Sequence, residues 1–235
     1  MPILRECSGK RRPVTIDWTR AIDGYCERLG PGYWAEPLNA LSNAAFLIAA
    51  YWMWRRLGGE RLPLARALCA LLAAIGIGSY LFHTHATRWA SVADMVPIGV
   101  FILAYLFAAN LHFWRWPAWL AALGAAGFVP YAMLLTPAFR ALPFFGISAF
   151  YWPVPLLIAA YALLLRHRAP ATARGLALGA GLLGVSLVFR SLDAALCPAW
   201  PYGTHFLWHL LNAVMLGWMI EVYRRHMLAE KGAGR

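Results

Sequence analysis

Thr204-His205-Phe206-Leu207-Trp208-His209 opens an apolar run that continues to residue 223. A run of about 20 apolar residues is long enough to cross a bilayer as a helix. His205 and His209 are four residues apart, so both side chains lie on one face of that helix. Titratable groups are costly inside a membrane and are usually kept there for function. The run therefore predicts a membrane-spanning helix whose first turns carry a functional site.

The composition extends this prediction to the whole chain of 235 residues. Hydrophobic residues make up 61% of it and charged residues 13%, whereas a soluble domain is about half apolar and about a quarter charged. The longest polar segment, about the first 35 residues, is too short to bury much of a core. We therefore expect an all-α, polytopic membrane protein without a separate soluble domain.

Seven stretches are apolar and long enough to span the membrane. They cover residues 37–55, 64–83, 90–111, 117–136, 145–165, 174–193 and 204–223. Pro143, Pro153 and Pro155 blur the start of the fifth stretch. Its alternative interpretation is a helix that begins near Tyr151, after a re-entrant or interfacial segment.

The direction of the spans follows from Lys and Arg, which accumulate in cytoplasmic loops. Twelve basic residues lie in the alternate loops and the C-terminal tail on one side, and the opposite loops hold only Arg88 and Arg140. The N-terminal tail is an exception, with six basic residues. We expect an extracytoplasmic tail over residues 1–36, a seven-helix membrane domain over 37–223 and a cytoplasmic tail over 224–235.

The net charge of +11 does not indicate a nucleic-acid partner. The basic residues form neither one run nor one face, as a nucleic-acid footprint would require. They lie between the apolar segments, as topology signals do.

Polar residues of four predicted helices meet at one depth. With this topology, the second span ends near His83 and the third has Asp94 just over one turn inside. The seventh begins with His205 and His209, and the first begins on the same side near Glu36. Neutral imidazoles favour Zn²⁺, and three protein ligands leave a fourth position for water. The sequence therefore predicts a zinc site of three histidines in the outer half of the bilayer.

Asp94 and Ser79 complete the predicted site. Zinc lowers the pKa of a bound water to about 7, and Asp94 is placed to take the proton as the water attacks a carbonyl. Ser79, one turn before His83, is expected to stabilise the developing oxyanion or to brace the water. His85 points to a different helix face from His83 and ranks below the three predicted ligands.

The cysteines allow a bridge over the site. Cys26 precedes the first span and Cys197 lies between the sixth and seventh. Both are outside in the predicted topology, where disulfides persist. A Cys26–Cys197 bridge would tie the N-terminal tail over the site, and two free thiols are the alternative. Cys7 and Cys69 are expected to be unpaired.

Charged residues near the outer ends of the spans have two interpretations each. Asp23, Glu27 and Glu36 offer the hard oxygen ligands that suit Ca²⁺. The alternative, which the spacing alone favours, is a solvated acidic patch or helix-start charges stabilised by the helix dipole. Arg190 and Asp193 are expected to pair with each other or with the first helix.

The chain also carries four motifs in a fixed order. They are Glu36-x-x-Asn39-x-x-Ser42-Asn43, Gly78-Ser79-x-x-Phe82-His83, Asp94-x-x-Pro97 and His205-x-x-Trp208-His209. Together they resemble the alkaline ceramidase family, which belongs to a wider group of seven-helix membrane hydrolases that includes the adiponectin-receptor-like proteins. The resemblance runs from about Asp23 to Trp218.

This resemblance implies a zinc-dependent amidase that cleaves the N-acyl bond of ceramide-like lipids to a sphingoid base and a fatty acid. It implies zinc ligation by His83, His205 and His209. It implies Asp94 as proton acceptor and donor and Ser79 as oxyanion stabiliser. It also favours the Cys26–Cys197 disulfide and a calcium ion held by Asp23, Glu27 and Glu36.

The chain departs from the family near the site. Asp23-Gly24-Tyr25-Cys26-Glu27 is one residue longer than the family's Asp-Trp-Cys-Glu run, and the next expected oxygen ligand is Leu29. His85 stands where Thr is usual, and Met95 where an acid is common. These differences leave room for a lipid amide other than ceramide. The Arg- and Ala-rich composition is typical of a high-GC bacterium, for which we expect the inner membrane.

The sequence thus favours an intramembrane amidase whose lipid substrate enters laterally through a pocket between helices. One alternative is a seven-helix receptor or sensor with a structural zinc, in which a fourth protein ligand would fill the open position. Another is a metal-ion transporter, which would need polar residues in both halves of the membrane.

Overall fold

The computed structural model describes residues 16–233, and within that range the chain is helical, with no β-sheet. The elements are α1 (Pro37–Ser42), α2 (Ala44–Leu57), α3 (Pro63–His85), α4 (Arg88–His112), α5 (Ala118–Ala126), α6 (Phe128–Arg140), the 3₁₀ helix η1 (Gly146–Ser148), α7 (Pro153–Leu165), α8 (Pro170–Leu196) and α9 (His205–Ala233). The predicted all-α class is confirmed.

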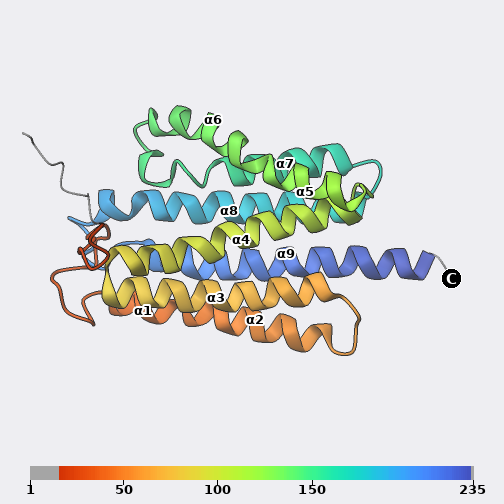
Figure 1. The fold of residues 1–235 in the computed structure, drawn as a ribbon. Helices are drawn as coiled ribbons and strands as arrows, with labels where there is room; N and C mark the ends of the chain where they lie inside the picture. The colour runs from red at the N-terminus through yellow and green to blue at the C-terminus, as the bar shows by residue number, and fades with distance from the viewer. Residues whose placement is uncertain (1–15, 234–235) are drawn as a thin grey trace, which may run out of the picture.

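The helices run back and forth along one direction, as Figure 1 shows. Because α1 and α2 are separated only by Asn43, and α5 and α6 only by Gly127, the described chain forms seven helical stretches. Five are long and apolar enough to cross a membrane: Pro63–His85, Arg88–His112, Ala118–Arg140, Pro170–Leu196 and His205–Gly232. Of the other two, α2 has 14 residues and α7 has 13.

Two predicted boundaries differ most from those observed. α7 begins at Pro153 rather than at residue 145, close to the alternative start near Tyr151, because prolines occupy its first turn and the preceding residues form turns and η1. α9 continues to Ala233, through most of the segment predicted as a tail. Glu221 pairs with Arg224 and Arg225 at helical spacing, which supports this extension.

α9 lies at the centre of the bundle, where it packs against α2, α3 and α8. Its buried apolar residues include Ala213, Leu216, Ile220 and Tyr223. Gly175 and Gly179 of α8 face it, and a Cβ atom added at Gly175 would lie 2.6 Å from Val222 Cγ2. Small residues at such crossings let helix backbones approach closely, so this helix pair forms the tight centre of the fold.

The described part of the N-terminal segment folds back over the ends of α3 and α4 (Figure 1). The backbone N–H of Ile22 donates to Ala86 O at 2.7 Å, and that of Trp89 donates to Trp18 O at 3.1 Å. These bonds hold the extended segment against the α3–α4 turn.

A disulfide closes this end of the bundle. Cys26 and Cys197 are bonded, with their Cα atoms 5.4 Å apart, so the predicted bridge is confirmed. Cys69 is buried in α3 as a free thiol. Cys7 lies outside the described residues. The bridge ties the segment before α1 to the loop between α8 and α9.

At the opposite end, Glu221 of α9 is a buried acid among arginines. It accepts two hydrogen bonds from Arg56 of α2, at 3.0 and 3.1 Å, and one from Arg225 at 2.8 Å. Only 5% of Glu221 is exposed. Its partners are less buried, since the side chains of Arg56 and Arg225 are 45% and 60% exposed, so solvent would partly screen their charges if Glu221 were removed.

We predict that Glu221→Ala lowers the free energy of unfolding by about 1.5 to 3 kcal/mol, because charged hydrogen bonds from three arginines are lost, including that of Arg224, whose side chain is 15% exposed. Glu230→Ala is the control, because its partner Arg115 is largely exposed and such pairs contribute about 0–1 kcal/mol. Thermal denaturation in detergent measures both. Equal midpoints for the two variants would contradict the prediction.

Candidate metal centre

Three buried histidines meet where the N-terminal segment covers the bundle. His83 lies in the last turn of α3, and His205 and His209 lie in the first two turns of α9. One ring nitrogen from each lies within 4.8 Å of the others. Over residues 16–233 this is the one cluster of at least three His, Cys, Asp or Glu side chains close enough to hold a metal ion. The three predicted ligands are therefore brought together.

Two of the rings are held through their Nδ1 atoms. His83 Nδ1 lies 2.6 Å from Glu36 Oε2, and since a carboxylate only accepts, the imidazole donates. His209 Nδ1 lies 2.7 Å from Ser42 Oγ, whose own proton goes to Asn39 O at 3.0 Å. His209 therefore also donates from Nδ1. Both rings keep Nε2 as a free lone pair, which is the arrangement of metal-ligating histidines.

Several polar atoms at this place are sealed from solvent and have no partner within the protein. They are His205 Nδ1, His209 Nε2 and Asp94 Oδ1. Buried polar atoms are nearly always hydrogen-bonded, so three in one place need an explanation. A bound cation with its water is one, because imidazole nitrogens are good ligands for divalent metals. By this test the residues fit a metal ion.

His205 is positioned by contacts that the sequence pattern did not predict. Asp193 Oδ1 accepts from the backbone N–H groups of Thr204 at 2.8 Å and His205 at 2.9 Å, at the start of α9. Its Oδ2 accepts from the N–H of Cys26 at 2.9 Å. The ring of Tyr25 stacks on that of His205, with centroids 3.7 Å apart.

The predicted pairing of Asp193 with Arg190 or the first helix is wrong. Three backbone donors surround Asp193, which is 1% exposed. Arg190 instead donates to Ile147 O at 2.5 Å and to Tyr25 Oη at 3.3 Å. A carboxylate that caps a helix from another element leaves no spacing signal, because its donors lie 11 and 12 residues away along the chain.

Asp94 and Ser79 lie at the contact of α3 with α4. Ser79 is buried one turn before His83 on α3, and the Oδ1 atom of Asp94 on α4 is sealed from solvent without a hydrogen-bond partner. Gly78 makes this helix contact possible, since a Cβ atom there would collide with the backbone of Ala93 and Asp94. Asp94 is not one of the clustered metal-binding groups, so its carboxyl is available beside them for another role.

Glu36 stays ionised in its buried position. Burial alone would raise its pKa, but the hydrogen bonds from His83 and Arg28, together with the positive charge of Arg28, outweigh burial and hold the pKa below its usual value. The carboxylate therefore accepts from His83 as an anion. Asn39 Nδ2 adds a third donor at 3.1 Å.

The remaining predicted site residues lie elsewhere. His85 is exposed and packs against Tyr33 and Trp89, outside the metal cluster. The predicted calcium site gains no support. Asp23 is exposed, and Glu27 accepts hydrogen bonds from the first backbone N–H groups of α1. Glu27 therefore fits the alternative interpretation, a charge at the start of a helix.

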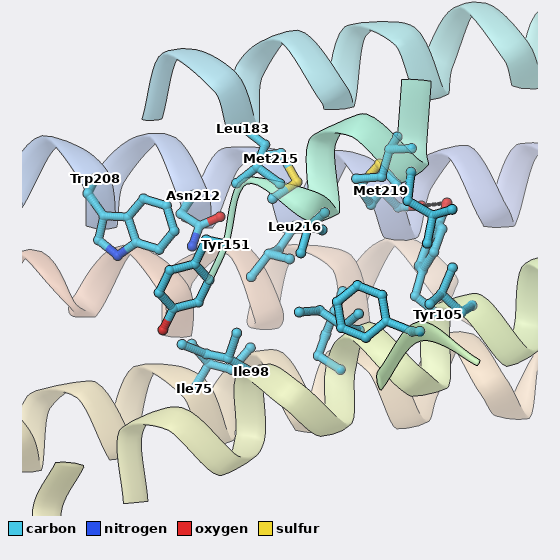
Figure 2. A pocket seen from close by; sticks show the side chains of 17 residues that line it. Ile75, Ile98, Tyr105, Tyr151, Leu183, Trp208, Asn212, Met215, Leu216 and Met219 are labelled. Carbon is cyan, nitrogen blue, oxygen red and sulfur yellow. Dashed lines mark hydrogen bonds between the residues drawn. The ribbon is translucent and has the colours of Figure 1, made fainter. Parts of the chain in front are cut away.

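An apolar pocket extends along α9 from the histidine end (Figure 2). Figure 2 shows Trp208, Asn212, Met215, Leu216 and Met219 following one another along α9, on one wall of the pocket. The other walls come from α3, α4, α7 and α8, with Ile75, Ile98 and Leu183 among the labelled residues, and from Phe128 of α6 and Tyr151, which precedes α7. The pocket is almost entirely apolar, so it suits a hydrocarbon chain.

A protein-family model described as Ceramidase matches residues 24–233. The match takes in every helix from α1 to α9 and all the residues of the histidine cluster. No curated protein matches the chain.

We predict that Ser42→Ala weakens metal binding by about 10- to 100-fold, because His209 loses the partner that fixes its orientation. Titration with Zn²⁺ against a chromophoric chelator measures the affinity. Ser91→Ala is the control, since Ser91 Oγ contacts only the Met95 sulfur and lies in the first turn of α4. Equal affinities for the two variants would show that the Ser42 contact has no role.

Proposed function

This chain belongs to the ceramidase family, and on that premise we propose that it is an intramembrane zinc-dependent amidase, which hydrolyses the N-acyl bond of ceramide or a related lipid amide. The observation that carries the proposal is the buried cluster of three histidines beside Asp94, at the end of an apolar pocket. A charged or polar substrate would have no reason to enter such a pocket.

The proposal includes seven membrane spans, with the N-terminus outside and the C-terminus in the cytoplasm of a bacterium. The seven helical stretches support it, α7 and the bent α1–α2 stretch being the shortest. The disulfide lies at one end of the bundle, as suits an oxidising compartment. Arg56 and Arg225 lie at the other end, around Glu221, as positive charge at the cytoplasmic side requires.

The substrate lies with its amide at the histidines and a hydrocarbon chain in the pocket. Ile75, Ile98 and Asn212 of the pocket each lie one helical turn from Ser79, Asp94 and His209 on the same helix faces, which supports a pocket next to the cluster along the bundle. Tyr151 and Trp208 pack together at this end, with ring centroids 5.4 Å apart. The substrate comes from the bilayer, because both its chains are apolar and the site is embedded among spans.

His83, His205 and His209 hold the zinc, which when bound supplies a Lewis acid that polarises a carbonyl oxygen and acidifies water. Asp94 accepts a proton from the water whose oxygen attacks the amide carbon, and donates it to the nitrogen as the C–N bond breaks. Ser79 donates a hydrogen bond to the developing oxyanion. One water is consumed, and the products are a fatty acid and an amine.

We predict that Asp94→Asn lowers kcat on a fluorescent N-acyl sphingoid by about 10²- to 10⁴-fold while the zinc content stays at one per chain, because an amide cannot accept the proton. The exposed Asp17→Asn serves as the control. His83→Ala is expected to lose zinc and turnover together.

Full turnover in a zinc-loaded Asp94→Asn protein would contradict the assigned role. Zinc bound stoichiometrically without hydrolysis of any lipid amide tested would favour a structural zinc in a receptor or sensor. Zinc transport into proteoliposomes without hydrolysis would favour a transporter.

The pocket generates a separate prediction on chain length. Ile98→Trp fills part of the pocket from α4, so hydrolysis of a long-chain amide is expected to fall by about 10-fold or more while a short-chain amide is spared. Val100→Trp is the matched control, because Val100 lies on the same helix and is exposed. The kcat/KM ratio of long to short substrates measures the effect. An unchanged ratio in Ile98→Trp would place the chain elsewhere.

A further inference from the structure

Arg28 is a buried cation in the segment between the disulfide and α1. Its side chain is 5% exposed, and its Nε donates to Glu36 Oε1. Its Nη2 donates to the carbonyl oxygen of His83 at 2.9 Å, and its Nη1 donates to Gly30 O at 3.1 Å. All three guanidinium nitrogens thus have acceptors. One side chain joins the segment before α1 to the end of α3.

The acids around Arg28 are already occupied. Glu36 uses Oε1 for Arg28 and Oε2 for His83 and Asn39. Glu27 uses Oε1 for the N–H of Leu38 and Oε2 for the N–H of Asn39, at 2.7 and 2.8 Å. Each carboxylate oxygen of the two buried glutamates therefore faces a protein donor.

The same segment does not fit a calcium ion. Calcium takes six to eight oxygen ligands, typically with several carboxylates among them. Of the three acids first considered, Asp23 is exposed and the two glutamates are bound to the donors above. Leu29, at the position where a further oxygen ligand was expected, is 89% exposed and has no side-chain oxygen. The positive charge among these residues is that of Arg28.

We propose that Arg28 is the resident cation of this segment, a positioning residue that holds Glu36 and the end of α3 so that His83 binds zinc without help from calcium. The proposal deepens the proposed function, since it concerns the same zinc centre. It assigns to a side chain of the protein the charge balance that a bound calcium would otherwise provide.

The geometry gives Arg28 two routes to His83. Through Glu36 it fixes the acceptor of the His83 Nδ1–H, and through Nη2 it fixes the backbone carbonyl of the same residue. The ring and the main chain of one ligand are therefore held together. A lysine would keep the charge but not the planar fork that reaches both acceptors.

Zinc affinity measured without substrate tests the proposal. Arg28→Gln is expected to weaken zinc binding by about 10- to 100-fold, as loss of a partner behind a metal ligand does. Arg28→Lys is expected to fall between Arg28→Gln and the wild type, because it keeps the ion pair and loses the fork. Arg20→Gln and Arg20→Lys are the controls, since Arg20 is exposed in the same segment. Wild-type affinity in a folded Arg28→Gln protein would overturn the proposal.

Calcium supplies a second and independent readout. The wild-type protein is expected to have the same melting temperature and the same zinc affinity in millimolar CaCl₂ as in millimolar MgCl₂. A rise specific to calcium would overturn the proposal. If Arg28→Gln fails to fold, the Arg28→Lys protein is used instead. A zinc affinity of Arg28→Lys equal to that of Arg20→Lys would then overturn the proposal.

These measurements separate this inference from the proposed function. If the protein binds zinc but hydrolyses no lipid amide, the amidase proposal fails while the ranking of zinc affinities still judges Arg28. If hydrolysis is found and Arg28→Gln binds zinc as the wild type does, the amidase stands and the role of Arg28 falls.

Discussion

The hydrogen bond between His83 Nδ1 and Glu36 is the contact on which the rest of the site depends. It crosses from the segment before α1 to the end of α3, in surroundings where neither partner reaches bulk water. A buried carboxylate without partners would be very costly, so Glu36 needs Arg28 as well as His83. From this requirement follow the fold of the preceding segment and the orientation of the first metal ligand.

Asp193 is a second buried carboxylate that needs partners, and it holds the start of α9. Its two oxygens collect N–H groups from Cys26, Thr204 and His205, so one carboxylate joins α8, the segment before α1 and the start of α9. The disulfide joins two of these parts, the segment before α1 and the end of α8, by a covalent bond. Polar contacts therefore surround the histidines on the side of the N-terminal segment, and apolar helix packing surrounds them on the side of the bundle core. Such surroundings hold ligands in place before a metal arrives.

The sequence predicted the helical class, the three clustered histidines and the disulfide, because each leaves a mark in hydropathy, spacing or residue type. It placed Asp94 and Ser79 correctly on facing helices. It did not predict the contacts of Asp193, Tyr25 or Arg28, because their partners are set by how a loop folds over the bundle. The spacing alone favoured helix-start charges over calcium for Glu27 and Glu36, and the family resemblance favoured calcium, since residue type does not distinguish an acid that binds an ion from one that binds backbone N–H groups or arginine.

The disulfide has a consequence for biogenesis. Cys26 leaves the ribosome 171 residues before Cys197, a delay of roughly 10 to 35 seconds at ordinary rates of synthesis. The segment with Arg28 and Glu36 is thus made early, whereas two of the three histidines arrive with the last helix to be inserted. A nascent chain cannot assemble the metal cluster before insertion is complete. The order of residues along the chain therefore delays the histidine cluster until α9 has been made.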